Sequence, residues 1–455
     1  MKKKLTFKET VLITSMLFGM FFGAGNLIFP AKLGPDAGSN LIFAYLGMFI
    51  TAVGLPLLAT VALGMSRSDG ILTMTGKIGK KYSLFFSTLL YLTIGPLFAI
   101  PRCASTSFSV GAVNLIPEND SKLPLVIFSF VFFAIVLFFS LRPSGIMTWI
   151  GKILNPIFLA VLTLLVVAVL IHPLASVSTA IPTEAYSTPA KAFFNGFLEG
   201  YNTLDALAGL AFGIVVVNVV RKHGITKGDY VAASTAKSGV FSCLFMGFIY
   251  FFITLISAQS SPILSGCADG GEVLGRIAEH YFKTVGAVLM AAIVTFACLK
   301  TAIGLVTSCS EAFLKIFPKG PSYSVWAIVF CLVSFGIANF GLSSIVAYCV
   351  PVLMFIYPLA ITIILLALFS NFYHREHMVY VMTTAFTLVA AVFDFIKALT
   401  PMLPQGSVTA VLDRITALAE SCLPFFNIGL GWVCPAVLGF IIGLLMDKLK
   451  KKSAE

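Results

Sequence analysis

The chain has 455 residues, of which 58% are hydrophobic and only 11% are charged, and its mean hydropathy is +0.99. Soluble proteins contain about 25% charged residues, so this chain has too few charges to cover the surface of a soluble globule. The composition excludes a soluble enzyme, a disordered scaffold and a nucleic-acid-binding protein, and it predicts a membrane protein. The net charge of +11 is typical of basic loops on the cytoplasmic side of a membrane.

Twelve apolar segments are long enough to cross a bilayer, which requires about 20 apolar residues. They are residues 9–31, 41–65, 83–111, 124–141, 146–171, 191–220, 232–258, 282–315, 322–340, 343–369, 377–397 and 424–446. We therefore expect an all-α polytopic membrane protein with about twelve transmembrane helices. The first segment is too long for a signal peptide and lacks a small-residue cleavage pattern, so we expect it to be retained as a helix.

The distribution of basic residues predicts the orientation in the membrane. With the N-terminus inside, most of the 30 Lys and Arg residues fall in the inner connections and in the tails. This distribution follows the positive-inside bias. An even number of spans then places both tails, residues 1–8 and 447–455, in the cytoplasm.

Two segments interrupt the helical pattern at membrane depth. Residues 19–26 combine three glycines with Asn26, and residues 199–205 end at Asp205. Glycine costs about 1 kcal/mol in a helix interior, and acidic groups are expensive inside a bilayer. Because non-helical backbone is tolerated there only where it faces protein or a water-filled cavity, both segments are expected to line a cavity. The alternative for the first, close helix packing through glycines, explains neither Asn26 nor the second interruption.

The two interruptions also predict an internal repeat. Each lies in the first segment of a run of five, residues 9–171 and residues 191–369. Because five is an odd number, the second run enters the membrane from the opposite side. Inverted repeats with interrupted first helices are typical of secondary transporters. Two additional helices, within residues 377–446, lie outside this repeat.

Several runs of residues resemble the bacterial branched-chain amino acid carriers, and they are spread in order over essentially the whole chain. These runs are residues 18–30, Gly54-Leu55-Pro56, Gly95-Pro96, Ile100-Pro101-Arg102, Gly200-Tyr201, residues 205–208, residues 297–299 and residues 301–305. The resemblance implies a fold of the LeuT type with five plus five inverted helices. It also implies import of leucine, isoleucine and valine across the bacterial inner membrane by symport with Na⁺, with no organic cofactor.

The substrate site is expected at the two interruptions. A helix that begins after Gly23 offers free backbone N–H groups and a positive dipole end to a carboxylate. An unwound segment and its carbonyls suit an ammonium group or a cation. The candidate substrate-binding residues are Gly23, Ala24, Gly25 and Asn26 in the first interruption and Gly200, Tyr201, Thr203 and Asp205 in the second. The alternative for Asp205 is a packing carboxylate that is satisfied by a neighbouring hydroxyl or by a helix N-cap.

The resemblance also implies a cation site, from which this chain departs at one position. The implied ligands are the carbonyls of Gly19, Phe22 and Ala297 and a pair of hydroxyl residues at positions 300 and 301. Thr301 supplies one hydroxyl, but Lys300 replaces the other. Two interpretations remain open. Either Lys300 points away and Na⁺ still binds, or its ammonium takes the place of the cation and couples transport to H⁺.

Arg102, within the third segment, is interpreted either as a structural charge or as part of a gate.

Other functional classes have little support in the sequence. The chain carries no zinc-protease, P-loop or nucleophile-elbow motif, so an enzyme is not expected. A channel would more often show rings of charge or a filter loop. A sensor that binds amino acids without transporting them is a further alternative.

Overall fold

The computed structural model describes residues 4–23, 25–66, 68, 70–112, 122–142, 146–225, 228–370, 372–373 and 377–454. This part of the chain is helical and contains no strand. The α-helices are α1 (Phe7–Phe21), α2 (Gly25–Ala37), α3 (Leu41–Phe49), α4 (Leu55–Ser66), α5 (Ile71–Thr75), α6 (Lys80–Leu92), α7 (Ala99–Ala112), α8 (Lys122–Leu141), α9 (Ile146–Ile171), α10 (Pro189–Glu199), α11 (Asp205–Lys222), α12 (Gly228–Gln259), α13 (Gly270–Ile316), α14 (Tyr323–Ala338), α15 (Leu342–Leu368), α16 (His377–Leu399), α17 (Ser407–Cys422) and α18 (Val433–Ala454).

Short helical turns connect several of these helices. They are η1 (Gly38–Asn40), η2 (Ile50–Gly54), η3 (Thr93–Leu97), η5 (Val177–Thr179), η6 (Glu184–Tyr186), η7 (Gly200–Thr203), η8 (Ser261–Ile263), η9 (Thr400–Met402) and η10 (Phe426–Ile428). Two of them are π-helical: η2 joins α3 to α4, and η3 leads from α6 towards α7.

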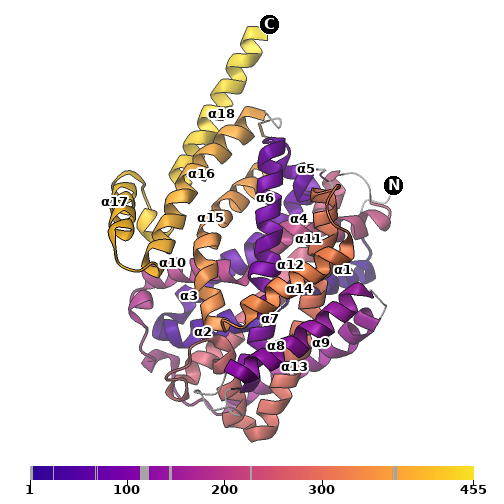
Figure 1. Cartoon of the computed structure of the whole chain (residues 1–455), viewed down its shortest axis with the longest axis vertical. Coiled ribbons are helices and arrows are strands. Elements are labelled where there is room, and N and C mark those ends of the chain that lie inside the picture. Colours follow the sequence, from indigo (N-terminus) through magenta and orange to yellow (C-terminus); the bar gives the residue numbers. More distant parts are fainter. Residues whose placement is uncertain are drawn as a thin grey trace.

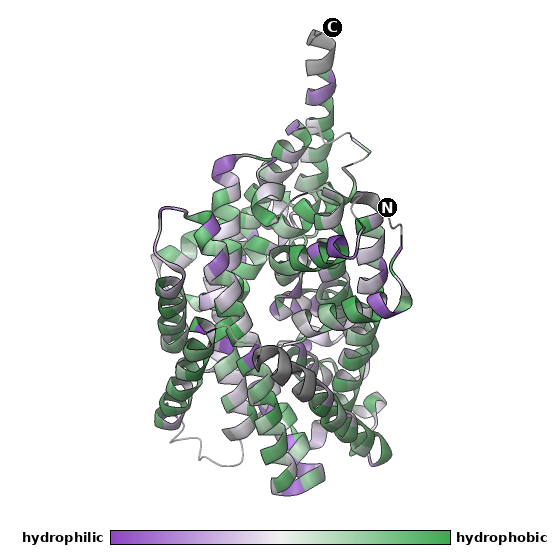
Figure 2. Cartoon of the chain, turned by 90° about the vertical axis from the view of Figure 1, so that its right-hand side faces the viewer, coloured by the Kyte–Doolittle hydropathy of each residue, from purple (hydrophilic) through white to green (hydrophobic). Residues whose placement is uncertain are grey.

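The all-helical membrane architecture predicted from the sequence is confirmed. Each of the twelve predicted segments overlaps a helix or two consecutive helices. The bounds differ most at α13, which begins at Gly270, and at α18, which begins at Val433, and the sequence did not predict α17. Among the described residues, seven helical stretches are long and apolar enough to cross a membrane, and the bent pair α10–α11 makes an eighth. The number of twelve spans stays a prediction, because Gly25–Ser66 forms one continuous stretch and α14 is short. Figure 2 shows hydrophobic residues along most of the length of the helices.

Local sequence signals explain where several helices begin. Thr6 forms a capping box with Glu9 at the start of α1, because each residue's side chain accepts from the backbone N–H of the other. Asp269 accepts from two backbone N–H groups at the start of α13. Thr188 caps α10, in which Pro189 occupies the first turn.

The centre of the molecule is built from helices that lie far apart in the sequence. Helix α2 packs on α12, α3 on α10, α4 on α11, and α7 on α13. Helices α8, α9 and α14 lie around α13 at the lower right of Figure 1. This arrangement brings both predicted interruptions, between α1 and α2 and between α10 and α11, into the interior.

The C-terminal helices form a separate layer. Helix α16 packs on α15 and on α18, and α17 lies at one side of the molecule (Figure 1). The sequence Gly439-x-x-x-Gly443 permits a close helix contact, and the structure identifies its partner as α16. A Cβ at Gly439 would lie 2.6 Å from the Met382 carbonyl oxygen, and one at Gly443 would lie 2.6 Å from Val379 Cα.

The contact between α2 and α12 is expected to be sensitive to a single methyl group. A Cβ at Gly34 would lie 2.7 Å from Ala258 N and 2.8 Å from Ser257 Cβ. Gly34→Ala should therefore destabilise the protein by about 1–3 kcal/mol, measured by thermal unfolding in detergent. The matched control is Gly304→Ala, where no atom lies within 4 Å of the added Cβ. Equal unfolding midpoints for the two variants would contradict this prediction.

Candidate functional site

The first interruption is shorter than the sequence suggested. Helix α1 continues through Gly19 to Phe21, and α2 begins at Gly25, while Ala24 lies outside the described residues. Asn26 bridges this break by two hydrogen bonds to Gly23. Its Oδ1 accepts from the Gly23 N–H at 2.6 Å, and its own N–H donates to the Gly23 carbonyl at 3.2 Å. The amide side chain therefore replaces part of the missing helical hydrogen bonding.

The second interruption is a tight turn between two helices that are bent by 44°. It consists of η7 and Leu204, whose φ of 65° is left-handed and ends the helical path. The Thr203 hydroxyl donates to the Gly200 carbonyl at 2.9 Å and accepts from the Asp205 N–H at 3.4 Å. Asp205 then begins α11, where the positive end of the helix dipole favours its carboxylate.

A buried hydrogen-bonded cluster joins the two interruptions. Asn26 Nδ2 donates to Asp205 Oδ2 at 2.6 Å and also to the Tyr250 hydroxyl. The Tyr250 hydroxyl in turn donates to the same Asp205 oxygen at 3.0 Å. All three side chains are at most 3% exposed. Because hydrogen bonds to a charged acceptor are stronger than neutral ones, this cluster holds α2, α11 and α12 together.

A buried guanidinium lies on the other side of the first interruption. Arg102, on α7, is 3% exposed and donates to the Asn202 carbonyl at 2.7 Å. Its guanidinium lies over the Phe29 ring, 4.9 Å from the ring centroid. A Cβ added at Gly25 would lie 3.1 Å from Arg102 Nη2 and 3.3 Å from the Thr203 carbonyl oxygen. Arg102 therefore contacts both interruptions.

These groups surround a cavity of about 60 Å³, several times the ~10–15 Å³ that one water molecule needs. Its polar lining is Gly23, Gly25, Asn26, Arg102, Thr203, Asp205 and Thr301. Its apolar lining is Phe21, Ile94, Ala99, Cys103, Leu204, Ala208, Phe212 and Leu305. The cavity thus combines one cationic group, one anionic group, the N-termini of two helices and an aliphatic and aromatic wall.

Of the seven substrate-site candidates that the structure describes, five line this cavity and two do not. Gly25, Asn26, Thr203 and Asp205 line the cavity with Gly23. Gly200 and Tyr201 do not line it.

Gly200 and Tyr201 have packing environments of their own. A Cβ at Gly200 would collide with the Thr51 hydroxyl, so the glycine permits close contact with η2. The Tyr201 ring stacks on Tyr357, with centroids 4.0 Å apart.

The candidate cation residues are only partly brought together. Thr301, on α13, lines the cavity, and its Oγ1 would lie 3.3 Å from a Cβ at Gly23. The same hydroxyl donates to the Ala297 carbonyl at 3.0 Å. Gly19 lies within α1, and the Phe22 ring stacks on Phe18. Lys300 is half-buried and does not line the cavity.

The sequence alone did not identify Tyr250 and Phe29 as residues of the site. Tyr250 lies in an apolar segment with no polar pattern around it, so only the folded structure shows that its hydroxyl reaches Asp205. Phe29 lies in α2, just after the first interruption, but carries no polar group that would identify it as a neighbour of Arg102. Arg102 itself was noticed, but the sequence left its role open.

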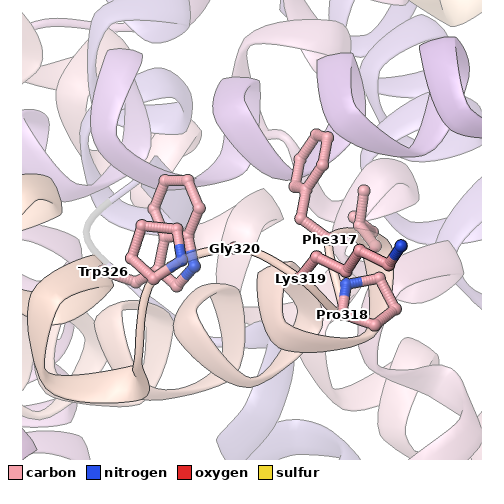
Figure 3. A pocket seen from close by; sticks show the side chains of 7 residues that line it. Phe317, Pro318, Lys319, Gly320 and Trp326 are labelled. Carbon is pink, nitrogen blue, oxygen red and sulfur yellow. The ribbon is translucent and has the colours of Figure 1, made fainter.

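A separate cavity of about 630 Å³ lies at the turn between α13 and α14. Figure 3 shows Phe317, Pro318 and Lys319 on one side of this turn and Trp326 on the other. It shares no lining residue with the cavity at the interruptions.

The Tyr250 hydroxyl should contribute measurably to stability. Tyr250→Phe removes a buried donor to a charged acceptor, so we expect a loss of about 1.5–3 kcal/mol in the free energy of unfolding. Tyr357→Phe is the matched control, because the buried Tyr357 hydroxyl has no hydrogen-bond partner in the described part of the chain. Thermal unfolding of both variants tests this. A control variant as unstable as Tyr250→Phe would show that the Asp205 contact is not the cause.

Comparison with known proteins adds a family assignment to this geometry. Residues 6–450 match the family model described as "Branched-chain amino acid transport protein". The branched-chain amino acid permease BrnQ of Lactobacillus delbrueckii subsp. lactis is 50% identical over 455 residues, which is all of both chains. BraB of Bacillus subtilis is 38% identical over 98% of this chain and 97% of its own, and BrnQ of Escherichia coli is 35% identical over 98% of each.

Solved structures with the same fold are more distant in sequence. Mhp1, a nucleobase-cation-symport-1 family transporter in a closed conformation, aligns with a TM-score of 0.61 at 16% identity. That alignment covers 98% of this chain and 93% of Mhp1. An inward-facing structure of Mhp1 aligns with a TM-score of 0.62 at 14% identity, over 98% of this chain and 91% of the other. At these identities the likeness concerns the fold alone.

Proposed function

The chain belongs to the branched-chain amino acid transport protein family, and from this premise we propose that it imports leucine, isoleucine and valine by symport with Na⁺. The observation that carries this proposal is the pairing of one guanidinium with one carboxylate around a single buried cavity. An amino acid is a zwitterion, so its two charged groups need partners of opposite sign in the same site. Burial strengthens both attractions because the surroundings have a low dielectric constant.

We assign the substrate carboxylate to the start of α2. The first backbone N–H groups of this helix have no intrahelical acceptor, and the dipole end is positive. Arg102 adds a guanidinium at 3.1 Å from the position that a Cβ would take at Gly25. Because Gly25 has no side chain, the carboxylate has space to approach the backbone.

We assign the substrate ammonium to Asp205 and to the carbonyls of the second interruption. Asp205 Oδ2 accepts from Asn26 and Tyr250, which leaves Oδ1 for the ligand. The Thr203 carbonyl lies 3.3 Å from the same Cβ position at Gly25, and Thr203 lines the cavity. These acceptors suit the three N–H donors of an ammonium group.

The apolar wall supports an aliphatic substrate side chain. Phe21, Ile94, Ala208, Phe212 and Leu305 line the same cavity as the charged groups. A branched side chain placed against this wall gains about 25 cal/mol for each Å² of apolar surface removed from water. A site with this wall favours leucine, isoleucine and valine over polar amino acids.

Transport requires the cavity to open to each side of the membrane in turn. We propose that residues 9–171 and 191–369 form the two inverted repeats, and that the breaks at α1–α2 and α10–α11 act as hinges between them. We place the coupling Na⁺ near Thr301 and the break at Gly23. The bacterial inner membrane, with both tails in the cytoplasm, is the proposed location.

The main test uses purified protein in liposomes, with leucine uptake and leucine binding measured together. Gly25→Leu fills the carboxylate position, and Asp205→Asn keeps the shape while removing the charge. Each should lower the affinity of this cavity for leucine, and the rate of leucine uptake, at least tenfold. Gly304→Leu is the control, because nothing lies within 4 Å of its added Cβ. Unchanged binding in a folded Gly25→Leu or Asp205→Asn protein would overturn the corresponding assignment.

The coupling ion is tested separately, because the alternative is coupling to H⁺ through Lys300. With Na⁺ as the coupling ion, an inward Na⁺ gradient drives leucine accumulation and a pH gradient in sodium-free buffer does not. Lys300→Thr should then leave the sodium dependence unchanged. If instead the pH gradient drives uptake, and Lys300→Thr makes uptake depend on Na⁺, the H⁺ alternative is correct. Leucine binding without any uptake would identify a sensor.

A further inference from the structure

A second cavity, of about 340 Å³, lies beside η7 and shares no lining residue with the first. It is lined by Glu199, Tyr201 and Asn202 at the end of α10 and in η7, and by Asp394 and Lys397 of α16. The Asn202 backbone carbonyl accepts from Arg102 in the first cavity, while its side chain donates to Glu199 at 3.1 Å beside the second. Consecutive residues of the second interruption, Asn202 and Thr203, therefore line two different cavities.

Asp394 is the unusual feature of this second cavity. Its side chain is 1% exposed, and neither carboxylate oxygen has a hydrogen-bond partner in the described part of the chain. The Tyr201 hydroxyl, which lines the same cavity, also has none. Burying a carboxylate is costly unless it is paired and hydrogen-bonded. A ligand with N–H donors would remove this cost.

Lys397, the cationic side chain that lines the cavity, does not donate a hydrogen bond to Asp394. Lys397 Nζ donates to the carbonyls of Phe426 at 3.1 Å and Asn427 at 3.3 Å, and it lies over the Phe426 ring. An ammonium has three N–H donors, so one remains for a ligand. Because Asp394 and Lys397 are three residues apart on α16, their side chains lie on the same face of the helix.

The remaining wall is mainly aliphatic. Leu198, Val350, Leu353, Met354 and Ala398 line the cavity beside the charged groups. A bare metal cation would gain nothing from these side chains, and an apolar molecule would gain nothing from Asp394. A ligand that satisfies both has an ammonium group and a short hydrocarbon chain.

We propose that this cavity is a second binding site for an aliphatic α-amino acid, with its ammonium on Asp394 and its carboxylate on Lys397. The proposal rests on the proposed function for the choice of leucine as the ligand, but its residues are separate from those of the first cavity. Its position beside η7 places the second ligand against the same turn that carries Thr203 and Asp205.

The test measures how many leucine molecules bind to each full-length chain, by equilibrium dialysis of the purified protein with saturating radiolabelled leucine. The parental protein should bind two. Asp394→Asn and Asp205→Asn should each bind one, and the double variant should bind none. Asp413→Asn, on the exposed face of α17, is the matched control and should bind two. Ala398→Trp fills the cavity without changing its charge and should also bind one.

The possible outcomes separate this proposal from the proposed function. If the parental protein binds one leucine, which Asp205→Asn removes and Asp394→Asn keeps, the second site is overturned and the first stands. If the single leucine is lost in Asp394→Asn and kept in Asp205→Asn, the second site stands and the proposed substrate site fails. If Asp394→Asn does not fold, two leucines in a folded Ala398→Trp protein would overturn the proposal, and one would support it.

Discussion

The hydrogen bond between Asn26 and Asp205 is the constraint on which the centre of this molecule depends. It joins two helix interruptions that are 179 residues apart in the chain. Each interruption leaves backbone groups without helical partners in a region where water is scarce. The Asn26 side chain satisfies one of these groups at Gly23 and then reaches the carboxylate that begins α11. A single amide therefore stabilises both breaks and sets the distance between them.

Charge balance follows from this constraint. Once Asp205 is buried at the start of α11, an opposite charge nearby lowers the cost of burial. Arg102 supplies that charge from α7, where it is held by the Asn202 carbonyl and the Phe29 ring. The two groups lie around one cavity, so a zwitterion can interact with both. The same two charges that balance each other in the fold thus also line the cavity.

Residues of η7 and the start of α11 line two different cavities. Thr203 and Asp205 line the first cavity, and Tyr201 and Asn202 line the second. Helix α16, which lies outside the predicted repeat, contributes Asp394 to the second cavity. Helix α16 and the end of α10 with η7 thus line the same cavity. The packing of α16 on α15 gives the C-terminal helices a structural connection to the central helices.

The sequence by itself determined the all-helical membrane class of the protein, the approximate positions of most of its long apolar helices and the two interruptions, because these follow from local composition. Apolar length and the cost of glycine and acidic residues at membrane depth depend only on neighbours in the chain. The partners of those residues were decided by tertiary structure. Tyr201 was expected at the substrate cavity, but its ring stacks on Tyr357 and lines the second cavity together with Asn202, whereas Thr203 and Asp205 line the first. Tyr250 reaches Asp205 only because α12 packs beside α11, a contact that no local pattern encodes.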